Sequence, residues 1–241
     1  MTFHHWRTHF DAQAARPLPP VEVPALTPRR RLALTRSLAK FQLGESGEGR
    51  VAHEIDRVTL PGVDADYRAS LKRFVAEEGR HARILGLMVN ALGGTLLPRS
   101  WTERAFVHGR RLLGVRFKLV VLLAAEVIGI AFYGLLARAL PPGPFASALE
   151  QICRDEEAHL RFHADFFLAQ RARPLAHALL CAAWWVVGPL AALTVLVDHR
   201  DTLRAFGVPL GEAVGLMLAR VREAAHRMGS PAALEALAVH R

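Results

Sequence analysis

The chain has 241 residues, of which 51% are apolar and 7% aromatic, and its formal net charge is +9. This length is sufficient for one helical domain with additions and excludes a peptide too small to bury a core. The two cysteines, Cys153 and Cys181, form no CxxC pair, which argues against a disulfide framework and a cysteine zinc site. The positive charge permits an anionic partner, and charge alone does not distinguish a membrane surface from nucleic acid.

The first part of the chain is expected to be an arm followed by a helix. Residues 1–28 hold five prolines and predict an extended arm. Thr27 and Pro28 are a favourable N-cap and first-turn pair, and they predict a helix that runs to about residue 55.

Three more long helices and a C-terminal extension are predicted after this first helix. A Gly-Gly pair closes the second helix, a capping box begins the third and a Pro-rich turn precedes the fourth. These helices cover about 65–92, 100–140 and 145–171. The predicted fold class is therefore all-α, with an arm (1–28), a four-helix bundle (29–171) and C-terminal apolar and amphipathic helices (172–241).

Each predicted bundle helix carries an apolar stripe that an acid interrupts near its middle. Glu126 stands in a long apolar run where no solvated face exists to receive it. Two helices carry Glu-x-x-His pairs, Glu78 with His81 and Glu156 with His159, and a spacing of three places both side chains on one helix face. Because buried carboxylates are costly unless they are paired or bound to a cation, the four stripes predict a shared metal site.

An internal repeat selects the ligands. Glu78 and Glu156, His81 and His159, and Glu48 and Glu126 are each separated by the same number of residues. The repeat favours Glu48 on the first helix, while Glu45, one turn earlier, remains an alternative or extra ligand. The predicted metal ligands are Glu48, Glu78, His81, Glu126, Glu156 and His159. Glu48 and Glu126 are the candidate catalytic acids.

Four further residues are expected to support these ligands. A metal-bound histidine usually donates its other ring nitrogen to an acceptor, so we expect Asp155 to serve His81 and Glu77 to serve His159. The interpretation favoured for His163 is a core histidine, with a ligand as the alternative. For Tyr133, core packing is favoured over a redox role.

The ligand set resembles that of the ferritin-like di-iron and di-manganese carboxylate proteins. Within this superfamily, "GEG" at 47–49, "EVIG" at 126–129 and "RDEEAH" at 154–159 are similar to the motifs of demethoxyubiquinone hydroxylases. The resemblance covers roughly residues 34–170 and implies a ferritin-like four-helix bundle that holds two iron ions. Manganese or a mixed pair could use the same ligands. The Pro-rich arm and the C-terminal apolar extension depart from the family.

The resemblance implies an oxygen-activating di-iron monooxygenase that acts on a hydrophobic, quinone- or lipid-like molecule. Its partners would be dioxygen, the hydrophobic small molecule and an electron donor or reductase. The alternative is a ferritin- or rubrerythrin-like protein that oxidises iron or removes peroxide without an organic substrate. No nucleic-acid partner is expected, and oligomer formation is left open.

Residues 178–197 carry no charge over a stretch long enough to cross a bilayer. Gly188 and Pro189 interrupt this stretch, so a membrane span, an interfacial segment and a fifth helix buried on the bundle remain alternatives. If the chain spans a membrane, Glu126 would be an intramembrane functional carboxylate. Basic and apolar residues at 110–118 would suit an anionic lipid surface.

The N-terminus lacks the apolar core of a signal peptide. A cytoplasmic location is therefore expected, with peripheral or integral attachment to the inner membrane as an open alternative. After Pro209, an amphipathic segment is expected to pack back on the bundle or to lie at an oligomer interface.

Overall fold

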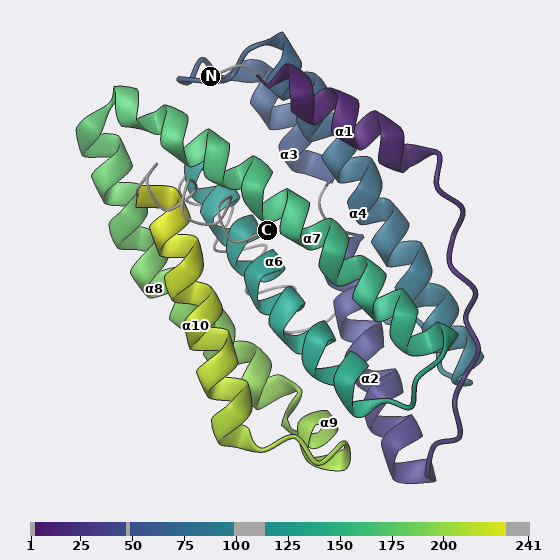
Figure 1. Ribbon diagram of the computed structural model, residues 1–241. Helices are drawn as coiled ribbons and strands as arrows, with labels where there is room; N and C mark the ends of the chain where they lie inside the picture. Colours follow the sequence, from purple (N-terminus) through teal and green to yellow (C-terminus); the bar gives the residue numbers. More distant parts are fainter. Residues whose placement is uncertain (1–2, 47–48, 99–113, 230–241) are drawn as a thin grey trace.

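Four long helices form the centre of the molecule. The computed structural model describes residues 3–46, 49–98 and 114–229, and all regular structure in these ranges is helical. The four helices are α2 (Pro28–Glu45), α4 (Ala65–Ala91), α6 (Gly114–Ala139) and α7 (Pro144–Ala169). Helix α2 packs on α4 and α6 packs on α7, so the bundle consists of two helical pairs (Figure 1).

Local sequence explains where these helices begin and end. The Thr27 hydroxyl accepts a hydrogen bond from the backbone N–H of Arg30, and Asp64 caps α4 in the same way through Tyr67. Gly93 follows α4 with a φ of 80°, a conformation that favours glycine. The helix expected to reach residue 55 is shorter than predicted: α2 ends at Glu45, and α3 (Gly49–Glu54) with a 3₁₀ turn (Ile55–Arg57) follows. The capping box at 100–103 lies outside the described residues.

The N-terminal arm contains a helix, α1 (His4–Ala14), which contradicts the extended conformation expected there. Phe3, Trp6 and Phe10 are buried; the Phe3 ring contacts Tyr67 of α4, and the Phe3 and Phe10 rings both contact Phe162 of α7. All five prolines of the arm come after α1, so they do not oppose helix formation. The α1 helix lies along α4, and residues 15–27 then lead to α2 (Figure 1).

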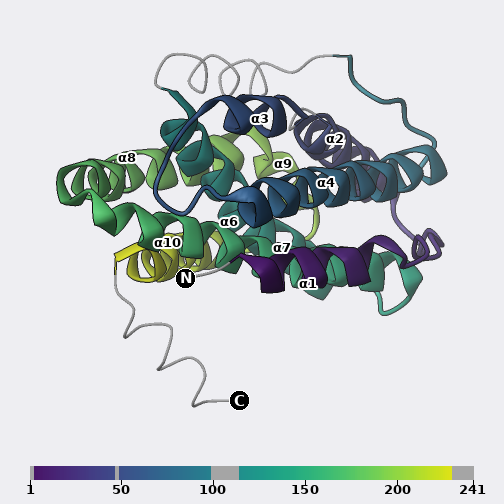
Figure 2. The same ribbon diagram turned by 90° about the horizontal axis from the view of Figure 1, so that it is seen from above.

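Three C-terminal helices cover the side of the bundle away from α1 and α4 (Figures 1 and 2). A 3₁₀ turn (Gln170–Ala172) leads into α8 (Pro174–Asp198), which is followed by α9 (Arg200–Ala205) and α10 (Leu210–Gly229). Helix α8 continues through Gly188 and Pro189, where the sequence suggested an interruption. At Gly188, α10 comes so close that a Cβ would lie 2.9 Å from Val221 Cγ1. Helix α10 packs on α6, α7 and α8, in line with the expectation that this segment packs back.

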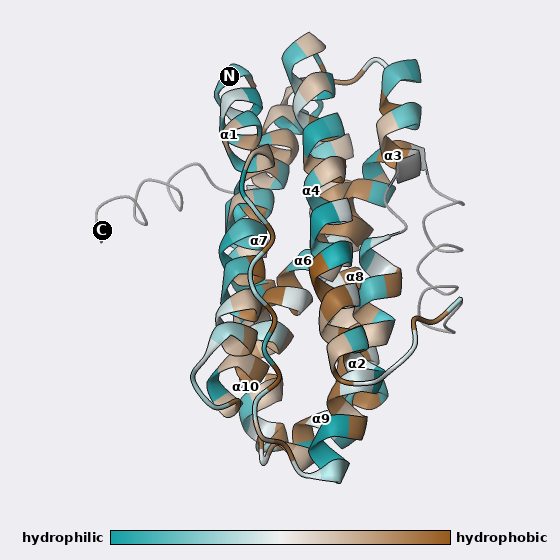
Figure 3. Ribbon diagram, turned by 90° about the vertical axis from the view of Figure 1, so that its right-hand side faces the viewer, coloured by the Kyte–Doolittle hydropathy of each residue, from teal (hydrophilic) through white to brown (hydrophobic). Residues whose placement is uncertain are grey.

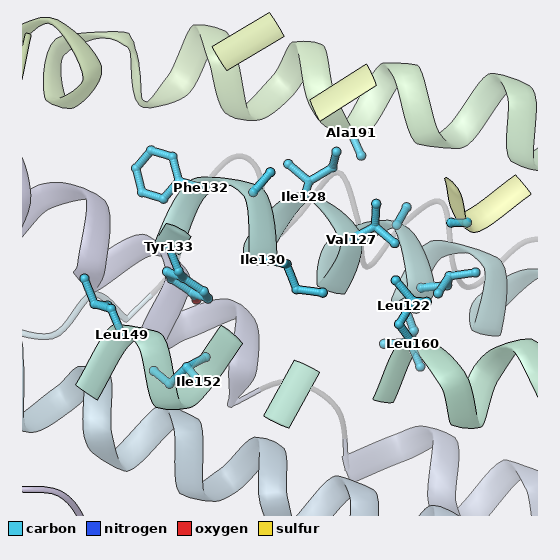
Figure 4. Close-up of a cluster of buried hydrophobic side chains, with 14 of the residues drawn as sticks. Leu122, Val127, Ile128, Ile130, Phe132, Tyr133, Leu149, Ile152, Leu160 and Ala191 are labelled. Atoms are coloured by element: carbon cyan, nitrogen blue, oxygen red, sulfur yellow. The ribbon is translucent and has the colours of Figure 1, made fainter. Parts of the chain in front are cut away.

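The two most apolar helices differ in how much of them is covered. Both α6 and α8 are long and apolar enough to cross a membrane, by length and composition alone. In the most apolar part of α6, 89% of the residues are buried inside the molecule, against 33% in α8. Burial in the bundle therefore accounts for the sequence of α6. Ala191 of α8 points toward Val127 and Ile128 of α6 (Figure 4). Unlike α6 and α8, α4 alternates between hydrophilic and hydrophobic residues along its length (Figure 3).

Candidate metal centre

Acids and histidines from α4 and α7 meet in the middle of the bundle. Glu78 and His81 of α4 and Glu156 and His159 of α7 are all buried, and a ligand atom of each lies within 4.8 Å of the others. Glu126 of α6 joins them, with its Oε2 atom 3.5 Å from His159 Nδ1. The structure thus brings together five of the six ligands predicted from the sequence.

Among the described residues of α2, Glu45 is the acid that lies at the cluster. The Tyr133 hydroxyl donates a hydrogen bond of 2.9 Å to Glu45 Oε1, and the Glu45 carboxyl also interacts with Glu78. Glu48, which the internal repeat favours, lies outside the described residues. Its role as a ligand stays a prediction. Tyr133 is fully buried, as expected for a core residue, and it also holds an acid of the cluster.

Both histidines turn one ring nitrogen toward the carboxylates of the cluster. His81 Nδ1 lies 3.0 Å from Glu156 Oε1, and His159 Nδ1 lies 2.8 Å from Glu78 Oε1. The other nitrogens face away. His81 Nε2 lies 3.3 Å from Asp155 Oδ2, and His159 Nε2 lies 3.2 Å from Glu77 Oε2. These are the cross-helix pairs that the sequence suggested, and they fix each ring so that Nδ1 is the atom available to a metal.

A residue from the arm links the two supporting acids. Arg16 Nη2 donates hydrogen bonds to Asp155 Oδ1 at 2.7 Å and to Glu77 Oε1 at 3.1 Å. Arg80 adds a second guanidinium 3.8 Å from Asp155. Arg16 was not predicted, because nothing in a Pro-rich segment indicates a partner more than a hundred residues away.

His163 adjoins the cluster next to Glu126. Its Nε2 atom lies 3.5 Å from Glu126 Oε1, and its ring packs edge-on against Phe74. The residue is fully buried, and among the described residues neither ring nitrogen has a hydrogen-bond partner. This is not the satisfied core histidine that was favoured, and a ligand role stays an open alternative.

The charges of the cluster depend strongly on one another. Burial raises the pKa of Glu78 well above its usual range, and the neighbouring charges of Glu156 and Glu45 raise it further. Burial alone would also raise the pKa of Glu156, but the charge of His159 and hydrogen bonds with both histidines lower it. Burial opposes protonation of His81, yet hydrogen bonds to Asp155 and Glu156 raise its pKa to about 9. Without a cation, the site therefore keeps protons on Glu78 and the histidines.

The arrangement of donor atoms fits metal ions. Glu78 Oε1, His81 Nδ1 and Glu126 Oε2 are buried, and although a polar atom lies within 3.5 Å of each, none of these contacts has the geometry of a full hydrogen bond. Buried polar atoms without partners are rare in proteins, and an ion between these atoms would satisfy them. Carboxylates combined with imidazoles suit iron or manganese, and four helices that each supply an acid form the donor set of a dinuclear site.

A cavity of about 120 Å³ lies beside the cluster. Glu45, Glu78, Glu126 and Glu156 form its acidic wall, and the cavity is otherwise lined mostly by apolar residues. The apolar lining from α6 and α8 comprises Val121, Leu122, Ala125, Ile128, Ala191 and Val195. A second set of polar residues in the lining consists of Lys40, Asp198 and His199, which were not predicted from the sequence. Lys40 Nζ donates a hydrogen bond of 2.6 Å to Asp198 Oδ1.

A chain of hydroxyl groups fixes the tautomer of His199. The Thr202 hydroxyl donates to the carbonyl oxygen of Ala33 at 2.8 Å, so in its 2.7 Å contact with Ser37 it must accept. The Ser37 hydroxyl proton is then used, and Ser37 Oγ accepts from His199 Nδ1 at 2.7 Å. Nε2 of neutral His199 is therefore a hydrogen-bond acceptor. Burial lowers the pKa of His199 to about 4, against the opposing charge of Asp198, so the ring is neutral at physiological pH.

Comparison with known proteins shows the fold. No protein-family model matches the chain. No curated protein matches it. A solved structure from Synechococcus, described as protein 19 with aldehyde deformylating oxidase activity, is similar with a TM-score of 0.66 and 19% sequence identity. The similarity covers 88% of this chain and 97% of the other. It confirms the all-α, ferritin-like helical fold, whereas the likeness to demethoxyubiquinone hydroxylases is not shown.

Proposed function

We propose that this protein is a dinuclear-metal oxygenase that acts on a hydrophobic substrate. The observation that carries the proposal is a buried carboxylate and histidine cluster that forms one wall of a largely apolar cavity. A metal site that only oxidised iron or removed peroxide would need no such cavity, so this arrangement favours an organic substrate over the ferritin- or rubrerythrin-like alternative. The aldehyde deformylating oxidase activity of the similar Synechococcus protein supports the proposal, and together with the apolar lining of the cavity it makes apolar aldehydes the first substrates to test.

The residues of the cluster would hold two ions. Glu78 with His81 and Glu156 with His159 would each supply a carboxylate and an Nδ1 atom, and Glu126 with an acid of the first helix, Glu45 or Glu48, would complete the set. Two iron ions bound here would bind dioxygen and supply electrons to it, and manganese or a mixed pair is the alternative. An external reductase or reduced donor would have to restore those electrons.

The chain itself would bind and orient the substrate. The apolar lining from α6 and α8 would hold a hydrocarbon chain and exclude water from the acids. Across this lining, Lys40 offers a donor and His199 Nε2 an acceptor, which suits a polar group on an otherwise apolar molecule. The substrate class that follows is a largely hydrocarbon molecule with at least one carbonyl or hydroxyl group, and this class includes quinone- and lipid-like molecules.

Metal analysis of ligand variants tests the site. Protein produced with iron should contain about two ions per chain, the number implied by this ligand set, and Glu78→Ala and His159→Ala should each lose most of them. Glu150→Ala is the matched control, because Glu150 is an exposed acid on α7. Full metal content in both ligand variants would show that the assignment is wrong.

Oxygen consumption tests the reaction. The iron-loaded protein, reduced without oxygen and then exposed to it, should consume dioxygen faster when an apolar aldehyde or a quinone precursor is present. Ligand variants should not respond. Rapid iron oxidation or peroxide removal that no apolar compound alters would instead support the ferritin- or rubrerythrin-like alternative.

A further inference from the structure

Helix α8 presents a continuous apolar face to solvent. Residues on this face follow one another at intervals of three or four, the spacing of neighbours on one side of a helix. The face, here called the α8 face, comprises Leu175, Leu179, Ala182, Val186, Leu190, Leu193 and Val197, with Trp185 beside it. Their large side chains are from 51% to 76% exposed. Single exposed apolar residues are common on proteins, but an unbroken stripe along a whole helix marks a surface that another phase or molecule covers.

The opposite side of α8 is fixed to the bundle. Leu180, Trp184, Gly188 and Ala191 are buried, and the Trp184 indole N–H donates a hydrogen bond of 2.9 Å to the carbonyl oxygen of Val221 on α10. This side cannot be exposed without separating α8 from α6 and α10. The α8 face is thus a rigid surface on the outer edge of the molecule (Figures 1 and 2).

Positive charge borders the α8 face at both ends of the helix. Arg171 and Arg173 precede α8 and Arg200 and Arg204 follow it, and all four are exposed. Arg200 lies 3.8 Å from the exposed carboxylate of Asp201, so the net positive charge is larger at the N-terminal end of the helix. Within α8, Asp198 at its C-terminal end is the single Asp, Glu, Lys or Arg. Apolar residues flanked by arginines, with an exposed tryptophan, are typical of helices that lie at the boundary between lipid headgroups and acyl chains.

We propose that the α8 face docks the protein on an anionic lipid surface, with the helix axis in the membrane plane. A spanning orientation is disfavoured, because α10 packs along α8 and would carry Arg220, Arg222 and Glu223 into the bilayer with it. A second copy of the chain would bring the arginines of two molecules together, whereas anionic headgroups complement them. The basic residues at 110–118 that the structure describes are already engaged: Arg116 donates to Gln170, and Lys118 pairs with Glu54.

Helix α8 also forms a wall of the cavity beside the carboxylate and histidine cluster. Ala191 and Val195 line the cavity, while their neighbours Leu190, Leu193 and Val197 belong to the α8 face. An apolar substrate dissolved in the bilayer would therefore enter beside the helix that touches the lipid. This route of substrate entry rests on the proposed oxygenase function, whereas docking on the lipid surface does not.

Vesicle flotation tests the docking. The full chain should float with vesicles of phosphatidylcholine and phosphatidylglycerol, and less with phosphatidylcholine alone. The triple variant Leu179→Ser, Val186→Ser, Leu193→Ser should partition at least about tenfold more weakly, because three large apolar side chains are removed. Leu32→Ser with Leu87→Ser is the matched control, since these exposed leucines lie on α2 and α4. Circular dichroism should show that all variants keep the same helical content.

Two further results decide the nature of the surface. Replacing Arg171, Arg173, Arg200 and Arg204 with glutamine should remove the preference for the anionic vesicles. If the wild type does not float, or the triple variant floats equally well, the proposal is wrong. If the lipid-free protein forms dimers that the triple variant abolishes, without vesicle binding, the α8 face is a contact between copies. Metal content and oxygen consumption in detergent do not depend on docking, so a failure here leaves the proposed function standing.

Discussion

The buried histidine at the cavity makes the stability of the fold depend on pH. His199 has a pKa of about 4 in the folded protein, below its ordinary value of 6.5, because burial disfavours the charged ring. Between these values the unfolded chain binds a proton that the folded protein does not, so stability falls as the pH drops through this window. The gap between the two pKa values corresponds to about 3 kcal/mol in the free energy of unfolding. This stability is present in full above pH 6.5 and is lost by about pH 4.

The variant His199→Gln should lose this part of the pH dependence. Urea unfolding of wild type and variant at several pH values from 7 to 4, both with a chelator, would measure it. Because the acids of the metal cluster titrate in both proteins, the difference between the two curves isolates His199. The variant should be less stable at pH 7, where the bond to Ser37 is lost, and should approach the wild type as the pH falls. Parallel curves would refute the assigned pKa and its cause.

Three other predictions concern the site and the packing. Asp155→Asn should weaken metal binding about 10- to 100-fold, since His81 loses its carboxylate acceptor, as measured by competition with a chromophoric chelator; unchanged affinity would contradict the supporting role. Gly215→Ala should raise the free energy of unfolding by about 0.5 to 1 kcal/mol, because this exposed position within α10 has nothing within 4 Å of the added methyl group. Gly188→Ala should cost about 1 to 3 kcal/mol through a clash with Val221, and Val221→Ala should recover part of it. Additive losses in that pair would show that the contact is not the cause.

The bundle was predictable because its signals are local. The Thr27–Pro28 pair and Gly93 mark helix ends through the backbone conformations that these residue types favour. The N-terminal helix was missed because the prolines after it dominated the composition of the arm. The spacing of Phe3, Trp6 and Phe10 was the available signal, although it predicts a helix only if a surface exists to cover those rings.

The metal centre was more predictable than the cavity beside it. Glu-x-x-His spacing and an acid in an apolar run indicate buried ionisable groups, so five residues of the cluster could be located from the sequence. Arg16 and His199 could not, because each acts through partners that only the packed bundle brings near. His199 in particular depends on Ser37 and Thr202, which come from two different helices and look like ordinary helix residues.

The charged groups of the centre form two layers, an outer one that includes Arg16 and Arg80 and an inner one made by the glutamates of the cluster, and each layer is neutralised by itself. Outside the ligands, two guanidinium groups face two carboxylates, Glu77 and Asp155, so this layer is electrically neutral by itself. Inside, protons neutralise the described glutamates, and two divalent cations would do the same. Ions could thus exchange for protons without changing the outer layer. The protein would therefore adopt the same fold before it binds metal, and it would release protons as metal binds.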